Sequence, residues 1–163
     1  MEEEEDIEDL RKLASYLKRQ GHKDEDIFCM LLGQFEGALY SWGNETTEKC
    51  DCSGNCCSAL NALYGTHERY TADMLSRYFF TKEEIPGNEG IYALFFYDTR
   101  GRAIHVCARV KGDFYLNASS LESGRTARIR PIGEIKEMFS AYSFRIKKLD
   151  EKAWKARNVD PRI

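Results

Sequence analysis

At residues 50–60 the chain reads Cys50-Asp51-Cys52-Ser53-Gly54-Asn55-Cys56-Cys57-Ser58-Ala59-Leu60. This segment predicts a loop that ends at Asp51 and continues directly into a helix, because apolar residues follow at helical spacing. Cys52 then lies in the first helical turn, where unpaired N–H groups and the helix dipole favour a thiolate. Gly54 adds no side chain beside that sulfur, so a substrate backbone can approach closely. The segment therefore predicts a nucleophilic cysteine that requires a base.

A candidate base lies on a predicted hairpin that follows about fifty residues later, over 103–119. A three-residue turn in this hairpin pairs Val110 with Phe114. That register places Asn117 opposite Cys107 and diagonally from His105, on the same face of the sheet. A carboxamide there can hold one ring nitrogen of the histidine while the other faces a thiol. A two-residue turn would move Asn117 to the opposite face.

These three residue types form a known catalytic arrangement of nucleophile, base and orienting residue: Cys52, His105 and Asn117. A lone histidine in a strand is commonly a core residue, and an asparagine near a turn commonly serves the turn. The three together, each in a suitable local setting, favour a cysteine hydrolase.

The pattern of apolar residues predicts helices first and strands afterwards. Helices are expected over 6–20, 24–37, from 52 onwards, 71–78 and 131–139, and strands over 91–97, 103–110, 114–119 and 142–148. The order predicts an α+β fold with an antiparallel sheet, in one domain over 1–163. The acidic run at 2–6 is typical of a frayed, solvated start, and the tail from Asp150 is polar apart from Trp154.

Composition excludes several classes of protein. The 163 residues are 42% hydrophobic and 12% aromatic, which is typical of a folded globule. A net charge of −3 gives no basic field for nucleic acid or an anionic membrane. No segment is apolar enough over a sufficient length to span a bilayer, and the N-terminus lacks the layout of a signal peptide. We expect synthesis in the cytosol; a signal removed earlier and action at the cell envelope stay open.

The six cysteines allow a second interpretation, a zinc-type site. Its ligands would be drawn from Cys50, Cys52, Cys56 or Cys57, and His67. The spacing Cys50-x-Cys52 lacks the usual two-residue gap, which disfavours this interpretation, and we expect no metal and no cofactor. Small apolar core roles are expected for Cys29, Cys57 and Cys107.

Four segments together resemble the NlpC/P60 family of cysteine peptidases, whose fold is a reduced form of papain. Asp51-Cys52-Ser53-Gly54 resembles the family's nucleophile motif, and Gly37-Ala38-Leu39-Tyr40-Ser41-Trp42-Gly43 resembles the segment before it. Arg69-Tyr70-Thr71-Ala72 resembles the stretch after the helix. His105-Val106 and Asn117-Ala118-Ser119 resemble the strands of the base and of the third polar residue.

The resemblance implies roles for individual residues. It implies that Cys52 is the nucleophile, His105 the base and Asn117 the third polar residue, at a position where the family often has histidine. Four residues match positions that line the family's substrate pocket, where a free amino end of a cell-wall peptide binds: Tyr40, Asp51, Ser53 and Arg69. An acidic residue with an arginine nearby can anchor an ammonium group, and tyrosine can add a hydrogen bond.

The resemblance thus implies hydrolysis of an amide bond in peptidoglycan stem peptides through an acyl-enzyme. The expected partners are peptidoglycan or its fragments, with no nucleic acid and no membrane span. Two other classes stay open beside the zinc-type site: an amidase or acyltransferase acting on a different substrate, and an inactive interaction module with the same fold. The oligomeric state and the second oxyanion donor are not predicted.

Overall fold

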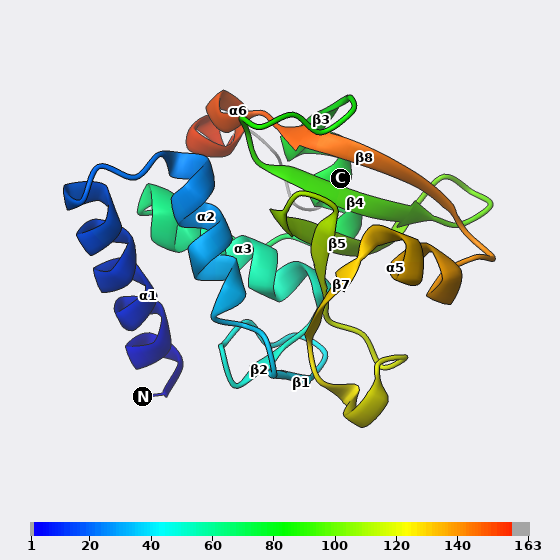
Figure 1. Ribbon diagram of the computed structural model, residues 1–163, viewed down its shortest axis with the longest axis horizontal. Coiled ribbons are helices and arrows are strands. Elements are labelled where there is room, and N and C mark those ends of the chain that lie inside the picture. The colour runs from blue at the N-terminus through cyan, green and yellow to red at the C-terminus, as the bar shows by residue number, and fades with distance from the viewer. Residues whose placement is uncertain (1, 158–163) are drawn as a thin grey trace.

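The computed structural model describes residues 2–157 (Figure 1). Its helices and helical turns are α1 (Glu2–Arg19), α2 (Asp24–Gly33), α3 (Cys52–Tyr64), α4 (Ala72–Met74), the π-helical turn η1 (Leu75–Phe79), the 3-10 turn η2 (Ser123–Arg125), α5 (Ile132–Met138) and α6 (Glu151–Ala156). Its strands are β1 (Leu39–Tyr40), β2 (Lys49–Cys50), β3 (Phe80–Glu83), β4 (Tyr92–Tyr97), β5 (Ala103–Lys111), β6 (Phe114–Asn117), β7 (Arg128–Pro131) and β8 (Ser143–Leu149). The predicted α+β class is confirmed.

Six strands of the described chain form one sheet in the order β3-β8-β4-β5-β6-β7, and every neighbouring pair is antiparallel. The short strands β1 and β2 pair with each other in parallel and stand apart from this sheet. All six residues of the central strand β4 are buried, as its continuous apolar run indicates.

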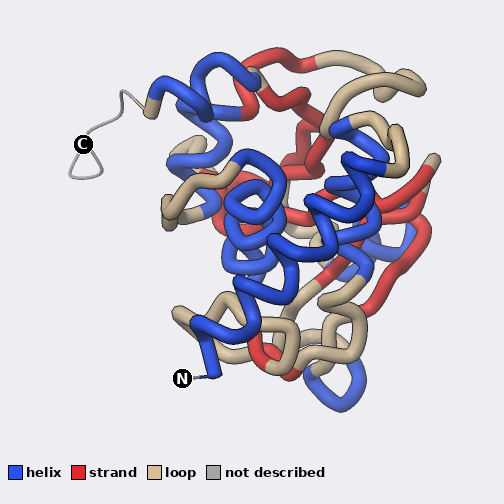
Figure 2. The backbone as a smooth tube through the Cα atoms, turned by 90° about the vertical axis from the view of Figure 1, so that its left-hand side faces the viewer, coloured by secondary structure: helices blue, strands red, loops and turns tan. Residues whose placement is uncertain are grey.

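Helices cover both faces of the sheet. Figure 1 shows α1, α2 and α3 to the left of the sheet and α5 to the right, and in Figure 2 the first three helices face the viewer. The larger core cluster joins these three helices to strand residues such as Phe95, Val106 and Leu116. A smaller cluster on the α5 side includes Phe96 and Phe139. The sheet therefore has two buried faces, and alternate strand residues serve different cores.

Helix α3 lies at the centre of the larger core. Every residue from Cys52 to Leu63 in this helix is buried. Asp51 caps its start by accepting a hydrogen bond from the Gly54 N–H, and Gly65 ends it in the left-handed conformation with φ of 68°. The predicted passage from loop to helix at Asp51 is confirmed.

Several expected boundaries are wrong. The acidic run at 2–6 is helical and belongs to α1, and Asp6 accepts hydrogen bonds from the N–H and hydroxyl of Thr47. Helix α2 ends at Gly33, not near residue 37. The edge strands β3 and β7 were not predicted. The polar tail contains α6, whose Trp154 is fully buried and donates to the Thr66 hydroxyl at 3.0 Å.

Candidate active site

Cys52 begins α3 and is mostly buried, with 9% of its surface exposed. The backbone N–H groups of Val106 and Ser53 face its sulfur and lower the pKa of the thiol. Val106 follows His105 in β5, so the start of α3 meets β5 next to the predicted base. The expected free space beside Gly54 is absent in this part of the described chain, because a side chain there would collide with the carbonyl of Asn44 and the carboxylate of Asp51. Glycine is needed here for packing of the preceding loop.

The carboxylate of Asp51 is held by several donors. Beside the Gly54 N–H at 2.7 Å, it accepts from the Gly43 N–H at 2.8 Å and from Arg69 Nη2 at 2.7 and 2.8 Å. Arg69 Nη1 also donates to the Ser53 hydroxyl at 2.9 Å. The structure therefore brings Asp51, Ser53 and Arg69 together around the first turn of α3, and this network fixes the position of Cys52.

Arg69 is shared with a second carboxylate, which the sequence did not predict. Its Nε lies 3.5 Å from Oε2 of Glu45, and burial raises the pKa of the Glu45 carboxyl while Arg69 lowers it. Two carboxylates around one guanidinium leave a surplus negative charge beside the first turn of α3. Nothing in the sequence near Glu45 distinguishes it from other acidic residues of the polar loop, so only the fold identifies it.

The structure brings His105 and Asn117 together, with His105 Nε2 at 2.7 Å from Asn117 Oδ1. The expected three-residue turn is wrong. Lys111 pairs with Phe114, which leaves a two-residue turn, and Val110 is an extra residue on β5. This β-bulge restores the pairing of Arg109 with Tyr115 and so keeps Asn117 on the face of His105.

The imidazole of His105 is fixed between aromatic rings on the α5 side of the sheet. It stacks on Phe139 with ring centroids 4.4 Å apart, and Phe96 lies 6.1 Å away on centroids. A second bulge, at Ile104, immediately precedes His105 in the pairing of β5 with β4. His105 itself pairs with Phe96 in the regular register, which sets the face of the sheet on which it lies, and the bulge changes the facing of the residues that precede it.

Cys52 and His105 approach from the two faces of the sheet. Cys52 belongs to the core on the side of α1–α3, whereas the His105 ring packs in the core beside α5. The pairing of β5 with β6 is confined to residues 109–115, so it stops before Val106, whose N–H lowers the pKa of the Cys52 thiol. Within residues 2–157 no hydrogen bond joins Cys52 to the imidazole, and His105 Nδ1 has no partner. Catalytic hydrogen bonds often tighten only when substrate binds.

Burial determines the protonation of both groups. Burial raises the pKa of the Cys52 thiol to about 11, although the Val106 N–H lowers it. Burial lowers the pKa of His105 to about 4, against the opposing effect of the Asn117 hydrogen bond. At neutral pH the free protein therefore holds a thiol and a neutral imidazole. Burial thus opposes the preformed thiolate that the helix start favours.

A groove of about 720 Å³ runs past the sulfur. Asp51, Cys52, Ser53 and Arg69 line it, and Trp42, which is 82% exposed, lies at its rim. Tyr40 is half-buried and does not line this groove: burial raises the pKa of its phenol, and the Asp51 carboxylate raises it further. The groove thus gives an extended molecule access to Cys52 over both polar and apolar walls. Its lining residues are Trp42, Gly43, Asp51, Cys52, Ser53, Arg69, Tyr70, Thr71, Ala72, Asp73, Met74, Arg102, Ala103 and Ile104.

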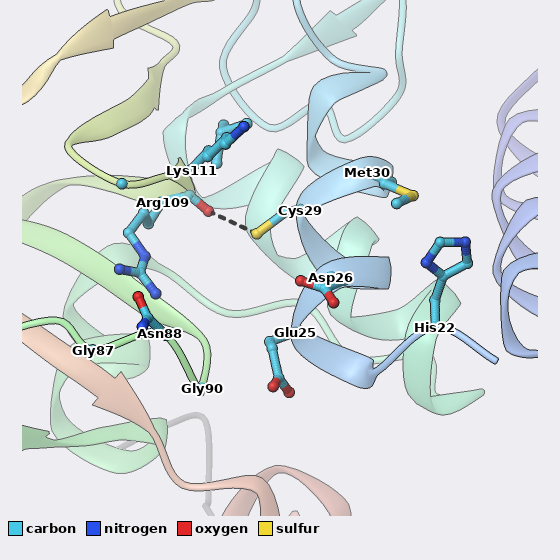
Figure 3. Close-up of a pocket in the computed structure, with 12 residues that line it drawn as sticks. His22, Glu25, Asp26, Cys29, Met30, Gly87, Asn88, Gly90, Arg109 and Lys111 are labelled. Carbon is cyan, nitrogen blue, oxygen red and sulfur yellow. Dashed lines mark hydrogen bonds between the residues drawn. The ribbon is translucent and has the colours of Figure 1, made fainter.

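A second cavity, of about 540 Å³, lies between α2, the loop at 87–90 and the β5–β6 turn (Figure 3). Figure 3 shows Cys29 donating to the carbonyl of Arg109, at 3.5 Å, with Glu25 and Asp26 on the adjoining helical turn. None of the residues that line this cavity is among those predicted for the active site.

The alternative zinc-type set is not assembled in the described chain. No group of three or more His, Cys, Asp or Glu side chains there has an arrangement that could hold a metal ion. His67 instead lies beside Arg11, whose Nη2 is 3.3 Å from the ring Nδ1. Cys57 and Cys107 are fully buried, as expected, whereas Cys29 is only partly buried.

Comparison with known proteins identifies the relatives of this fold. The sequence model of the NlpC/P60 family matches residues 37–162. The solved structure of NlpC2 from Trichomonas vaginalis is similar with a TM-score of 0.58 and 21% identity, over 78% of this chain and 47% of that one. NlpC1 from the same organism gives a TM-score of 0.58 and 21% identity, over 77% and 43%. The chain thus spans less than half the length of either Trichomonas protein.

A third structure, the NlpC/p60 domain of the peptidoglycan hydrolase SagA, has a TM-score of 0.52 and 19% identity, over 73% of this chain and 94% of that one. No curated protein sequence matches the chain. Among the residues that the structure describes, no helix combines the length and the apolar character required to cross a bilayer.

Proposed function

The chain belongs to the NlpC/P60 family, and on that basis we propose that it is a cysteine hydrolase that cleaves an amide bond in peptidoglycan stem peptides. The observation that carries the proposal is the hydrogen bond between His105 Nε2 and Asn117 Oδ1, at 2.7 Å, beside a helix that begins with a groove-lining cysteine. This bond occupies one ring nitrogen and leaves Nδ1 to serve as the base.

The chemistry follows from a neutral resting pair. When a peptide binds in the groove, Cys52 attacks the carbonyl carbon while its proton moves to His105 Nδ1. The C–N bond then breaks, the leaving amine takes that proton, and a thioester to Cys52 remains. Water attacks the thioester with His105 as base, the C–S bond breaks, and the sulfur recovers a proton. Asn117 orients the ring throughout.

Oxyanion stabilisation requires N–H donors at the carbonyl oxygen of the substrate. The start of α3 supplies the Cys52 N–H, since the first N–H groups of a helix have no partner within the helix. The positive end of the helix dipole adds to this effect. This arrangement stabilises the negative charge that develops on the substrate oxygen during attack.

We assign recognition of a free amino end to Tyr40, Asp51, Ser53 and Arg69. The surplus negative charge that Asp51 and Glu45 create around Arg69 favours an ammonium group at this end of the groove. One structural neighbour, the SagA domain, comes from a peptidoglycan hydrolase. Stem peptides of peptidoglycan suit this groove, since a short peptide offers both an amide bond to cleave and a free amino terminus to bind.

Purified protein incubated with peptidoglycan and with short stem peptides tests this function directly. Mass spectrometry of the soluble products should detect fragments that arise from one cleaved amide. Release of no fragment from any of these substrates by folded protein would contradict the proposed substrate class.

A further inference from the structure

We propose that Glu122 is a positioning residue of this active site: it fixes the Asn117 carboxamide so that His105 carries its proton on Nε2 and presents Nδ1 as the base. The role in catalysis rests on the proposed hydrolase function. The positioning itself depends only on the contacts described below.

Glu122 lies in the segment between β6 and η2, and its side chain is completely buried. One carboxylate oxygen, Oε2, accepts from Asn117 Nδ2 at 2.7 Å. The same oxygen accepts from Arg130 Nε at 2.8 Å, and Oε1 accepts from that nitrogen at 2.9 Å. Arg128 Nε lies 4.0 Å from Oε1. A buried carboxylate is thus balanced by arginines of β7 while one of its oxygens faces Asn117.

The chemistry of these groups allows one orientation of the Asn117 amide. A carboxylate paired with arginine is only an acceptor, so it requires the NH₂ end of the amide. Turning the amide by 180° would place Asn117 Oδ1 against Glu122 Oε2, two acceptors at hydrogen-bond distance. Glu122 therefore directs Asn117 Oδ1 toward His105.

The same reasoning fixes the histidine tautomer. Since Asn117 Oδ1 can only accept, the 2.7 Å bond to His105 requires a proton on Nε2. Cys107 Sγ lies 3.4 Å from the same oxygen and 3.3 Å from Nε2, so with this tautomer its thiol donates to Oδ1 and its sulfur faces the Nε2 proton. Nδ1 is left with its lone pair, as a general base requires. The negative charge of Glu122 also polarises the amide toward the imidazolium that forms during attack.

Nitrogen-15 NMR of histidine-labelled protein measures the tautomer without any substrate. The chain contains only three histidines, and a His105→Gln spectrum assigns the signals of His105. We expect wild type to show the Nε2–H tautomer. Glu122→Met removes the acceptor at similar length and should give a mixture of tautomers. It should also lower kcat by about 10- to 100-fold with little change in KM.

Glu134→Met is the matched control. Glu134 also binds Arg130, with Oε1 at 2.8 Å from Nη1, but it is half-exposed and makes no contact with Asn117. This variant should keep both the tautomer and kcat. Glu122→Gln retains one acceptor oxygen, so its tautomer ratio and its kcat should lie between those of wild type and Glu122→Met. This comparison separates loss of the acceptor from loss of packing.

A folded Glu122→Met protein with the wild-type tautomer and wild-type kcat would overturn the inference. If Glu122→Met does not fold, the tautomers of Glu122→Gln and wild type test the inference. An Nδ1–H tautomer in wild type overturns it directly. A tautomer change in a protein that cleaves no stem peptide contradicts the proposed function alone. Cleavage that depends on Cys52, with no tautomer change in the Glu122 variants, contradicts the inference alone.

Discussion

Arg69 Nη2 contacts both carboxylate oxygens of Asp51, at 2.7 and 2.8 Å. Asp51 precedes Cys52 and caps α3, whereas Arg69 lies in the segment that follows the helix. One ion pair therefore ties the chain before the helix to the chain after it. The position of the candidate nucleophile depends on this pair as well as on the packing of α3.

Asp51→Ala should lower the free energy of unfolding by about 2 to 4 kcal/mol, because it removes both a helix cap and the partner of a partly buried arginine. Urea denaturation followed by circular dichroism measures this change. Glu83→Ala is the control, since the contact of Glu83 with Arg145, at 3.9 Å, is exposed on both sides and should contribute less than about 1 kcal/mol. Equal effects of the two substitutions would show that Asp51 is not a structural anchor.

The substrate role of Asp51 has a separate test in Asp51→Asn, which keeps the size of the side chain and removes its charge. On a peptide with a free amino end, kcat/KM should fall about tenfold more than on the same peptide N-acetylated, because only the free amine forms a charge-assisted bond. Parallel assays of the two peptides give this ratio. An equal loss on both peptides assigns Asp51 to structure alone.

The pKa shifts of the free site predict that Cys52 is a protonated thiol at neutral pH before substrate binds. Since burial raises the pKa of Cys52 to about 11 and lowers that of His105 to about 4, wild type and Cys52→Ser should show the same ultraviolet thiolate absorbance at pH 7. The two should diverge only as the pH approaches 11. A thiolate signal at pH 7 that disappears in Cys52→Ser would demonstrate a preformed ion pair instead.

His105 also predicts a pH dependence of stability. Its folded-state pKa of about 4 lies below the ordinary value of 6.5, so between these values the unfolded chain binds a proton that the folded protein does not. Stability should fall as the pH falls from 6.5 to 4, with a contribution from this group of about 3 kcal/mol. Unfolding of wild type and His105→Gln, compared at each pH, isolates that contribution. A difference between the two proteins that stays constant over this range would contradict it.

The part of the site around Cys52 could be predicted from the sequence, because it depends on local structure. The cap at Asp51 and the helix that follows have a clear signature in residue type and spacing. The proximity of His105 and Asn117 was also expected, but from an incorrect turn length. A two-residue turn with a bulge at Val110 gives the same facing as a three-residue turn, and nothing in the sequence separates the two.

Long-range contacts explain what could not be predicted. Glu122 is one acidic residue in a polar segment, and only the pairing of β6 with β7 brings Arg130 to it. Trp154 is a single apolar residue in a charged tail, yet it fills a site against Tyr70 and Phe79. Gly54 suggested an open approach for substrate, whereas the carbonyl of Asn44 occupies that space. Each of these depends on a partner distant in the chain or on a loop with no regular pattern.

The central claim is that Cys52 forms a covalent acyl-enzyme, and the mass of the intact protein during turnover measures it directly. Wild type mixed with a stem peptide and quenched in acid should carry an added mass equal to the acyl part of that peptide, and peptide mapping should locate it on Cys52. Cys52→Ala, shown by circular dichroism to be folded, should carry no such mass and release no product. The account is contradicted if Cys52→Ala releases product at the same rate as wild type. It is also contradicted if the acyl group maps to another residue.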